Sequence, residues 1–282
     1  MKRSSFVAAL CTSFVILLLS CAQDPPFDVV SGEEAIAGAE PGFGHYVYRP
    51  KGMNEVSVHR RSYALELMDG QAEGIVHFYY PPRFAFRKAA ATVLGGGGRA
   101  SWICNVSWGE MMAASGFVAV VFDAKPNERE LFRALLDRVL AEADALFIDS
   151  GRLALWGEGH STPLQLTAAM SSDLPVEPKA MVCVSPVMQI GETPFEFDPA
   201  SLRTDLSMLI TMGEMEEFYE VRRSVELFSE AAAKAGMSIE RLTCPGGSHN
   251  WMTTDQYESD FFAAPEAVEV VKKEIEFLRR HL

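Results

Sequence analysis

The chain has 282 residues, of which 48% are hydrophobic and 22% charged, and its formal net charge at pH 7 is −13. An acidic surface repels polyanions, so nucleic acid is excluded as a partner, and anionic lipid headgroups are disfavoured as a docking surface. The length suits one large folded domain, and no internal repeat is visible.

The N-terminus has the pattern of an export signal. Lys2 and Arg3 precede an apolar run that is too short to span a bilayer, and the run closes on Leu-Leu-Ser-Cys at Cys21. This ending resembles the cleavage box of bacterial lipoproteins, which implies removal of residues 1–20 and a lipid anchor at Cys21. The alternative is an ordinary secretory signal with an incidental cysteine. Cleavage removes two positive charges and leaves a net charge of −15.

The resemblance to lipoproteins implies a location in the bacterial cell envelope, with membrane contact through the anchor. Ala22 follows the cysteine in place of an aspartate, and the sequence leaves open which membrane and face receive the protein. Residues 21–43 are rich in Pro, Gly, Ala and acidic residues and predict a flexible tether. Residues 44–282 form the predicted domain.

Three cysteines remain in the mature chain besides Cys21, namely Cys104, Cys183 and Cys244. An odd number is incompatible with a complete disulfide framework. Cys183 lies within an apolar run and is predicted to be a buried core thiol.

The order of apolar runs along the chain predicts an α/β domain. Residues 46–80 alternate apolar and polar side chains around a Gly/Asp turn and predict an antiparallel hairpin. Short strands then alternate with helical stretches, and an amphipathic helix over 265–282 closes the chain. The predicted strands cover 91–94, 117–122, 153–156, 180–185, 207–212 and 239–244. This alternation indicates a mainly parallel sheet with helices on both faces, whose ligands bind beyond the carboxyl ends of the strands.

A glycine-rich loop follows the strand over 91–94. Its four glycines, Gly95 to Gly98, allow backbone N–H groups to approach an anion or a developing oxyanion. Two other interpretations remain: simple loop flexibility, and a dinucleotide turn built on Gly95, Gly97 and Ala100, with Asp123 after the next strand. The long gap before the following helix disfavours the dinucleotide turn.

The order of these motifs resembles the α/β-hydrolase superfamily, and most closely its small esterases and dienelactone-hydrolase-like members. The resemblance implies the α/β-hydrolase fold and a catalytic histidine at His249, in the loop CPGGSHNW. It also implies an acid at Glu216, with Glu214 and Glu217 as less favoured claimants, and an oxyanion loop at Gly95 to Gly98. The alternatives are that His249 caps a helix and that Glu216 is one more solvated carboxylate near a helix start.

The stretch LALWGEGHSTPLQLTAA carries the predicted nucleophile elbow. Without gaps, the family pattern places Gly159 where the serine nucleophile is expected. Glycine relieves the roughly 1–3 kcal/mol of backbone strain that a non-glycine residue carries there. A register shifted by two residues makes Ser161 the nucleophile, with Thr162 supplying an oxyanion N–H. Alternatively, Ser161 is a helix N-cap bonded to a backbone N–H near Leu164.

Two functions follow from the two registers. In the first, the protein is a non-catalytic ligand-binding or scaffold protein; in the second, it is a carboxylic ester hydrolase using Ser161, His249 and Glu216. The predicted ligand is a small ester or acylated envelope compound, and the sequence predicts no cofactor and no metal site. Two sets of apolar residues are candidates for the pocket. Phe195 and Phe197 are candidates for its entrance, and Met188, Met212, Met215 and Met252 for one wall, with core packing as the alternative for each methionine.

Overall fold

The computed structural model describes residues 27–41, 44–85, 91–95, 98–125, 127–172, 174–187, 189–190, 193–194, 202–253 and 265–282. Its centre is a nine-stranded sheet in the order β1-β2-β3-β5-β4-β6-β7-β10-β11. The strands are β1 (Val30–Ser31), β2 (Ser57–Leu67), β3 (Gly70–Tyr80), β4 (Ala91–Gly95), β5 (Val118–Phe122), β6 (Asp149–Glu158), β7 (Ala180–Val184), β10 (Ser207–Gly213) and β11 (Ile239–Cys244). A separate small ribbon pairs β8 (Gln189–Ile190) with β9 (Thr193–Pro194).

The sheet is antiparallel at its N-terminal side and parallel elsewhere. β1, β2, β3 and β5 pair antiparallel in that order, and every pairing from β5 through β4, β6, β7 and β10 to β11 is parallel. The predicted hairpin over 46–80 corresponds to β2 and β3, which pair from Ser57 with Tyr80 to Leu67 with Gly70. The carboxyl ends of the parallel strands therefore meet at one edge of the sheet.

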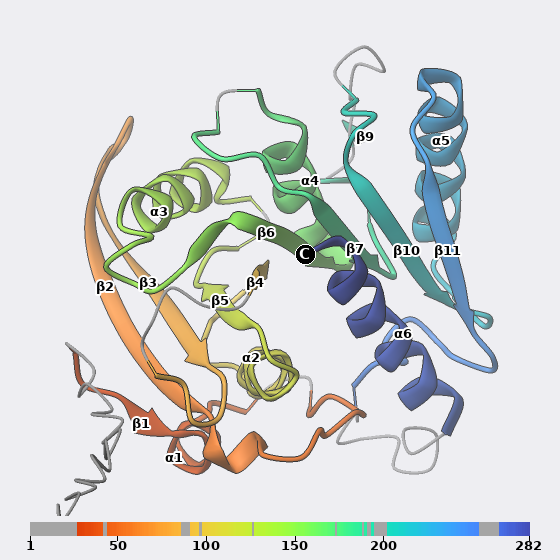
Figure 1. Ribbon diagram of the computed structural model, residues 1–282. Coiled ribbons are helices and arrows are strands. Elements are labelled where there is room, and N and C mark those ends of the chain that lie inside the picture. Colours follow the sequence, from red (N-terminus) through yellow and green to blue (C-terminus); the bar gives the residue numbers. More distant parts are fainter. Residues whose placement is uncertain are drawn as a thin grey trace, which may run out of the picture.

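Helices cover both faces of this sheet. One face carries α2 (Ile103–Ala114) and α6 (Pro265–His281); the other carries α3 (Arg129–Ala141), α4 (Thr162–Met170) and α5 (Tyr219–Ala235) (Figure 1). Two short helical elements, α1 (Gly32–Ala37) and η1 (Met53–Glu55), lie before β2, and a third, η2 (Gly159–Ser161), joins β6 to α4. The strands of the parallel part alternate little in burial, because each faces a helical layer on both sides.

The segment from residue 27 to residue 41 is folded onto the domain, in contrast to the tether predicted over 21–43. The ring of Phe27 stacks on His59 with ring centroids 3.8 Å apart. A capping box of Ser31 and Glu34 begins α1, and the backbone N–H of Glu40 donates to Ser101 at 2.9 Å. Residues 1–26, which include the predicted signal and Cys21, and residues 42–43 lie outside the described part.

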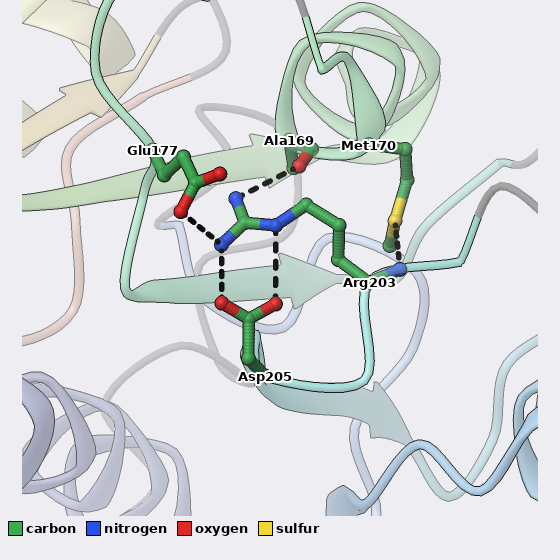
Figure 2. Close-up of polar contacts among 5 residues, drawn as sticks. All are labelled: Ala169, Met170, Glu177, Arg203 and Asp205. Carbon is green, nitrogen blue, oxygen red and sulfur yellow. Dashed lines mark hydrogen bonds and ion pairs between the residues drawn. The ribbon is translucent and has the colours of Figure 1, made fainter.

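A partly buried arginine, Arg203, fixes the far end of α4. The guanidinium of Arg203 pairs with Asp205 through two hydrogen bonds of 2.9 and 3.2 Å, and it lies 3.6 Å from Glu177 (Figure 2). It also donates to the carbonyl of Ala169 at 3.3 Å, in the last turn of α4, where carbonyl groups lack helical partners. The hydrogen bond from Arg203 lowers the pKa of Asp205. The helix that starts at the elbow is thus tied at its end to the segments before β7 and β10.

The three cysteines of the described chain, Cys104, Cys183 and Cys244, are buried and free. Cys183 has no exposed surface, as the apolar run around it predicted, and burial raises the pKa of its thiol far above the usual value. Within the described residues, no helix has the length and apolar character needed to cross a membrane.

Candidate functional site

The turn between β6 and α4 has Gly159 at its apex. Gly159 has φ +46°, in the left-handed region that strains residues with a side chain. A Cβ built on Gly159 would lie 3.6 Å from Nε2 of His249. At Gly157 a Cβ would come within 2.8 Å of Thr162 Cα, so glycine allows the strand and the helix to pack closely. The structure therefore follows the ungapped register.

Ser161 lies at the end of η2, and its hydroxyl is engaged by the backbone of the elbow. Its Oγ accepts a hydrogen bond from the N–H of Glu158 at 2.9 Å and donates to the carbonyl of Glu158 at 2.8 Å. The side chain makes no capping bond to α4, so the bond predicted near Leu164 is absent from this part of the structure. The N–H of Thr162 donates to the carbonyl of Gly159, and this differs from its predicted use as an oxyanion donor.

Glu216 and His249 come together from the loops after β10 and β11. Both carboxylate oxygens of Glu216 lie 3.0 Å from Nδ1 of His249, and the residue is only 2% exposed. This contact favours the tautomer in which Nδ1–H donates to Glu216 and Nε2 is left as an acceptor. Nε2 is the ring atom that faces Gly159. The structure thus joins the predicted acid and base and directs them to the elbow.

The other two glutamates of the GEMEEF segment hold the histidine loop in position. Glu217 accepts a hydrogen bond from the N–H of His249 at 3.0 Å, and Glu214 accepts one from the N–H of Gly246 at 2.8 Å. The loop also approaches β10 so closely that a Cβ on Gly213 would lie 2.2 Å from the carbonyl oxygen of Gly247. Phe218 packs its ring edge-on against the imidazole at 4.7 Å. The imidazole therefore has little freedom to turn.

Two of the four glycines in the glycine-rich loop, Gly95 and Gly98, lie in the described part. A Cβ on Gly95 would lie 2.6 Å from the ring of Trp108, and one on Gly98, where φ is +86°, 2.4 Å from Trp102. The N–H of Gly98 donates to the carbonyl of Ala124 at 3.1 Å. Close packing against tryptophan rings therefore accounts for these two glycines. Gly96 and Gly97 lie outside the described residues.

Glu158 is a site residue that the sequence reasoning missed. Its Oε1 accepts a hydrogen bond from Nε1 of Trp156 at 2.8 Å, and burial raises the pKa of its carboxyl to about 8. Burial also raises the pKa of Glu274, on α6, to about 8, and the nearby Glu158 adds to that rise. Glu274 accepts a hydrogen bond from the hydroxyl of Thr211 at 2.6 Å. A sequence signal existed, since residues 156 and 158 share one face of β6.

A cavity of about 1240 Å³ opens at the carboxyl edge of the parallel strands, between Gly159 and His249. Its walls combine aromatic rings with charged and amide side chains. The aromatic residues are Trp102, Trp108, Trp156 and Phe218; the charged ones are Arg99, Lys125, Glu158 and Glu220; the amides are Asn105, Asn127 and Asn250. Apolar and aromatic walls with a few polar groups are the composition of a site for a small organic molecule.

The apolar residues predicted for the pocket separate into different environments. Met252 lines the cavity, Met212 packs against the core between the sheet and α3 to α5, and Met215 is 65% exposed. Met188, Phe195 and Phe197 lie outside the described residues. Among the residues that the structure describes, no group of three or more His, Cys, Asp or Glu side chains gathers to hold a metal.

No protein-family model and no curated protein matches the chain. Similar solved structures include paraoxon-phosphorylated esterase 2 of Thermogutta terrifontis, at 18% identity and a TM-score of 0.58, covering 77% of this chain and 95% of that one. A bacterial heroin esterase is similar at 17% identity, with a TM-score of 0.63 and coverages of 82% and 86%. Carboxyl esterase 2 of the fungus Tuber melanosporum is similar at 15% identity, with a TM-score of 0.63 and coverages of 80% and 88%.

These likenesses concern the fold, because every identity is below 25%. They confirm the predicted fold class, a mainly parallel sheet covered by helices on both faces with an antiparallel hairpin at its N-terminal side. The structural neighbours are esterases, and the chain has the α/β-hydrolase fold.

Proposed function

We propose that this protein is a lipid-anchored protein of the bacterial cell envelope that binds a small ester or acylated compound in its cavity and does not cleave it through a serine nucleophile. The single observation that carries the proposal is Gly159 at the apex of the elbow. The base and the acid are in position, but the residue that His249 faces has no hydroxyl.

The cavity supports binding. With Nδ1 bonded to Glu216, His249 directs Nε2 toward the cavity that it lines, and four aromatic residues supply apolar walls. The neighbouring structures are of esterases, which supports an ester or a related acyl compound as the ligand class. The proposal that a ligand binds thus rests on the residues that line the cavity, and the proposal that catalysis is lost rests on Gly159.

The alternative, an active ester hydrolase using Ser161, His249 and Glu216, requires the hydroxyl of Ser161 to face the imidazole. Both hydrogen bonds of that hydroxyl go to the backbone of Glu158. Freeing it means breaking two bonds of the elbow at once, which would cost roughly 1–3 kcal/mol in total.

Fluorophosphonate labelling separates the two functions, because only a reactive serine forms the adduct. We expect no labelling of the wild-type protein above that of the Ser161→Ala variant. Labelling that depends on Ser161, together with turnover of short-chain nitrophenyl esters, would establish the hydrolase alternative.

Binding is measured through the tryptophans of the cavity wall, whose fluorescence responds to a bound molecule. We expect a saturable change on titration with short-chain aryl esters, and its loss in Asn250→Trp, which adds a bulky ring at an exposed position of the lining. The matched control is Met68→Trp, which adds the same ring to the 89% exposed tip of the β2–β3 hairpin. Equal titration curves for the two variants would contradict binding in this cavity.

A further inference from the structure

The first described residue and the cavity lie at opposite edges of the sheet. Phe27 stacks on His59 and packs its ring edge against Phe147, which lies two residues before the start of β6. The same cluster includes Tyr80, whose hydroxyl donates to the carbonyl of Leu146. Phe27 is therefore held at the amino edge of the parallel strands, whereas the cavity opens at their carboxyl edge.

The depth of the sheet sets the distance between these two edges. β6 runs from Asp149, beside the Phe27 cluster, to Glu158, in the cavity wall, and comprises ten residues. At the usual rise of a strand this is about 30 Å. The chain between the predicted lipidation site and Phe27 is shorter, because only residues 22–26 intervene. Fully extended, such a segment reaches about 20 Å.

From these lengths we propose that the anchored protein holds its cavity mouth away from the membrane that carries its lipid, and takes its ligand from the aqueous phase. Pressing the mouth against the bilayer would lift Phe27 about 30 Å from the surface, beyond the reach of the segment that joins it to Cys21. The inference rests on the lipid anchor of the proposed function and adds to it the source of the ligand.

The opposite orientation, with the cavity mouth against the bilayer, needs a test because exposed apolar residues lie beside the mouth. Phe218 lines the cavity and is 48% exposed, and its chain neighbours Met215 and Tyr219 are 65% and 66% exposed; these three residues are called the rim. Such residues suit insertion into a lipid surface. The short connection to Phe27 opposes that arrangement, and so does the charge of −15 on the mature chain, which anionic headgroups repel.

The occupant that fits is a water-soluble molecule with a flat apolar part and hydrogen-bonding groups. Tryptophan rings supply the flat surface, while Arg99, Lys125 and Glu220 supply charged partners in the same wall. A wall with charges of both signs is poorly matched to a bare acyl chain drawn from a bilayer.

The orientation is measured by energy transfer to a headgroup acceptor in proteoliposomes that carry the full-length lipidated protein. One donor dye is attached at Ala145→Cys, an exposed position next to Leu146 at the amino edge, and the other at Tyr219→Cys on the rim. Both variants carry Cys104→Ser, because Cys104 lines the cavity. We expect several-fold stronger transfer from position 145 than from position 219.

Equal or stronger transfer from position 219 in protein shown by mass spectrometry to carry the lipid would overturn the orientation and leave the anchor intact. Protein without lipid at Cys21 would overturn the anchor and, with it, this inference. A third variant, with twenty Gly/Ser residues inserted after Cys21, tests the cause. If the short connection sets the orientation, the difference between the two dyes should shrink, because the added chain extends the reach well beyond 30 Å.

Discussion

The two halves of the candidate site differ in what holds them. The acid–base half, Glu216 with His249, is fixed by the hydrogen bonds that the histidine loop donates to Glu214, Glu216 and Glu217 and by the close approach of Gly213 to Gly247. The elbow half, from Glu158 to Ser161, keeps the geometry of a strained turn but carries a glycine at its apex. The difference teaches that the acid–base geometry is part of how the loops pack, whereas the elbow lacks only the hydroxyl that a serine at position 159 would carry.

The largest expected effect comes from returning a hydroxyl to the elbow half. In Gly159→Ser the new Cβ lies 3.6 Å from Nε2 of His249, so one rotamer brings the hydroxyl within hydrogen-bonding reach of the base. We expect hydrolysis of nitrophenyl esters to rise about a hundredfold or more over the wild type, the lower range for general-base assistance. Positive φ at this position should lower the free energy of unfolding by roughly 1–3 kcal/mol.

The controls for that variant test which half supplies the activity. Adding His249→Ala to Gly159→Ser should abolish the gain, and adding Ser161→Ala should leave it unchanged. An inert but folded Gly159→Ser protein would mean that the oxyanion loop or the acid–base half no longer functions, which would break the comparison.

The next largest effect tests how the acid–base half is held. In Gly213→Ala the added methyl group meets the carbonyl oxygens of Gly247 and Ser248, at 2.2 and 2.4 Å from the ideal Cβ position. Backbone atoms cannot move aside cheaply, so we expect the free energy of unfolding in urea to fall by about 1–3 kcal/mol. Gly151→Ala is the control, since its nearest neighbour is a side-chain oxygen at 3.4 Å. Equal losses in the two variants would argue against a packed histidine loop.

A smaller effect follows from two carboxyl groups near the elbow, Glu158 in the cavity wall and the buried Glu274. Burial raises the pKa of Glu158 and Glu274 to about 8, above the ordinary value of 4.5 that applies in the unfolded chain. The folded state keeps protons that the unfolded state has released, so the free energy of unfolding should fall as the pH rises from about 4.5 to about 8. The slope should be at most about 1.4 kcal/mol per pH unit for each group.

Glu274→Gln isolates one of these groups, because glutamine keeps an acceptor for Thr211 and does not titrate. We expect a shallower fall of stability between pH 5 and 8 than in the wild type, measured by urea unfolding at several pH values. Glu73→Gln, at an exposed position of β3, should leave the slope as it is. A wild-type protein whose stability rises over this range would contradict the assignment.

The smallest effect concerns Ser161. Its hydroxyl serves the backbone of Glu158, so Ser161→Ala should lower the free energy of unfolding by about 1 kcal/mol and leave ligand titration unchanged. Loss of binding with unchanged stability would instead indicate that this hydroxyl faces the ligand.

Local patterns in the sequence predicted the sheet well, because the hairpin and the parallel strands follow from alternation and apolar runs. The resemblance to α/β-hydrolases implied the elbow at Gly159 and the roles of Glu216 and His249, and the structure brings these three residues together. Ser31 and Glu34 form a capping box, a local signal that the compositional prediction of a tether overlooked.

Other features depend on partners distant in the chain. Gly95 and Gly98 make room for Trp108 and Trp102, and a glycine run in the sequence does not reveal which ring will lie against it. From the sequence, Glu214 and Glu217 resemble ordinary solvated carboxylates. Their hydrogen-bond partners are backbone N–H groups of the histidine loop, 32 residues later in the chain. Phe27 likewise acquires its place only when His59 and Phe147 surround it.

The burial of Cys104, Cys183 and Cys244 affects how fast the protein is oxidised and so how long it stays functional. Cys183 and Cys244 are shielded in the native state, whereas Cys104 is 9% exposed beside the cavity; burial raises the thiol pKa of Cys183 and Cys244, the latter to about 11. An oxidant therefore reacts with Cys183 and Cys244 chiefly when the chain opens, because the reactive thiolate needs both exposure and an ordinary pKa. Each opening exposes three thiols that have no native pairing, and a mispaired disulfide would block refolding. The rate of unfolding, more than the redox potential of the compartment, then sets the working lifetime of the protein.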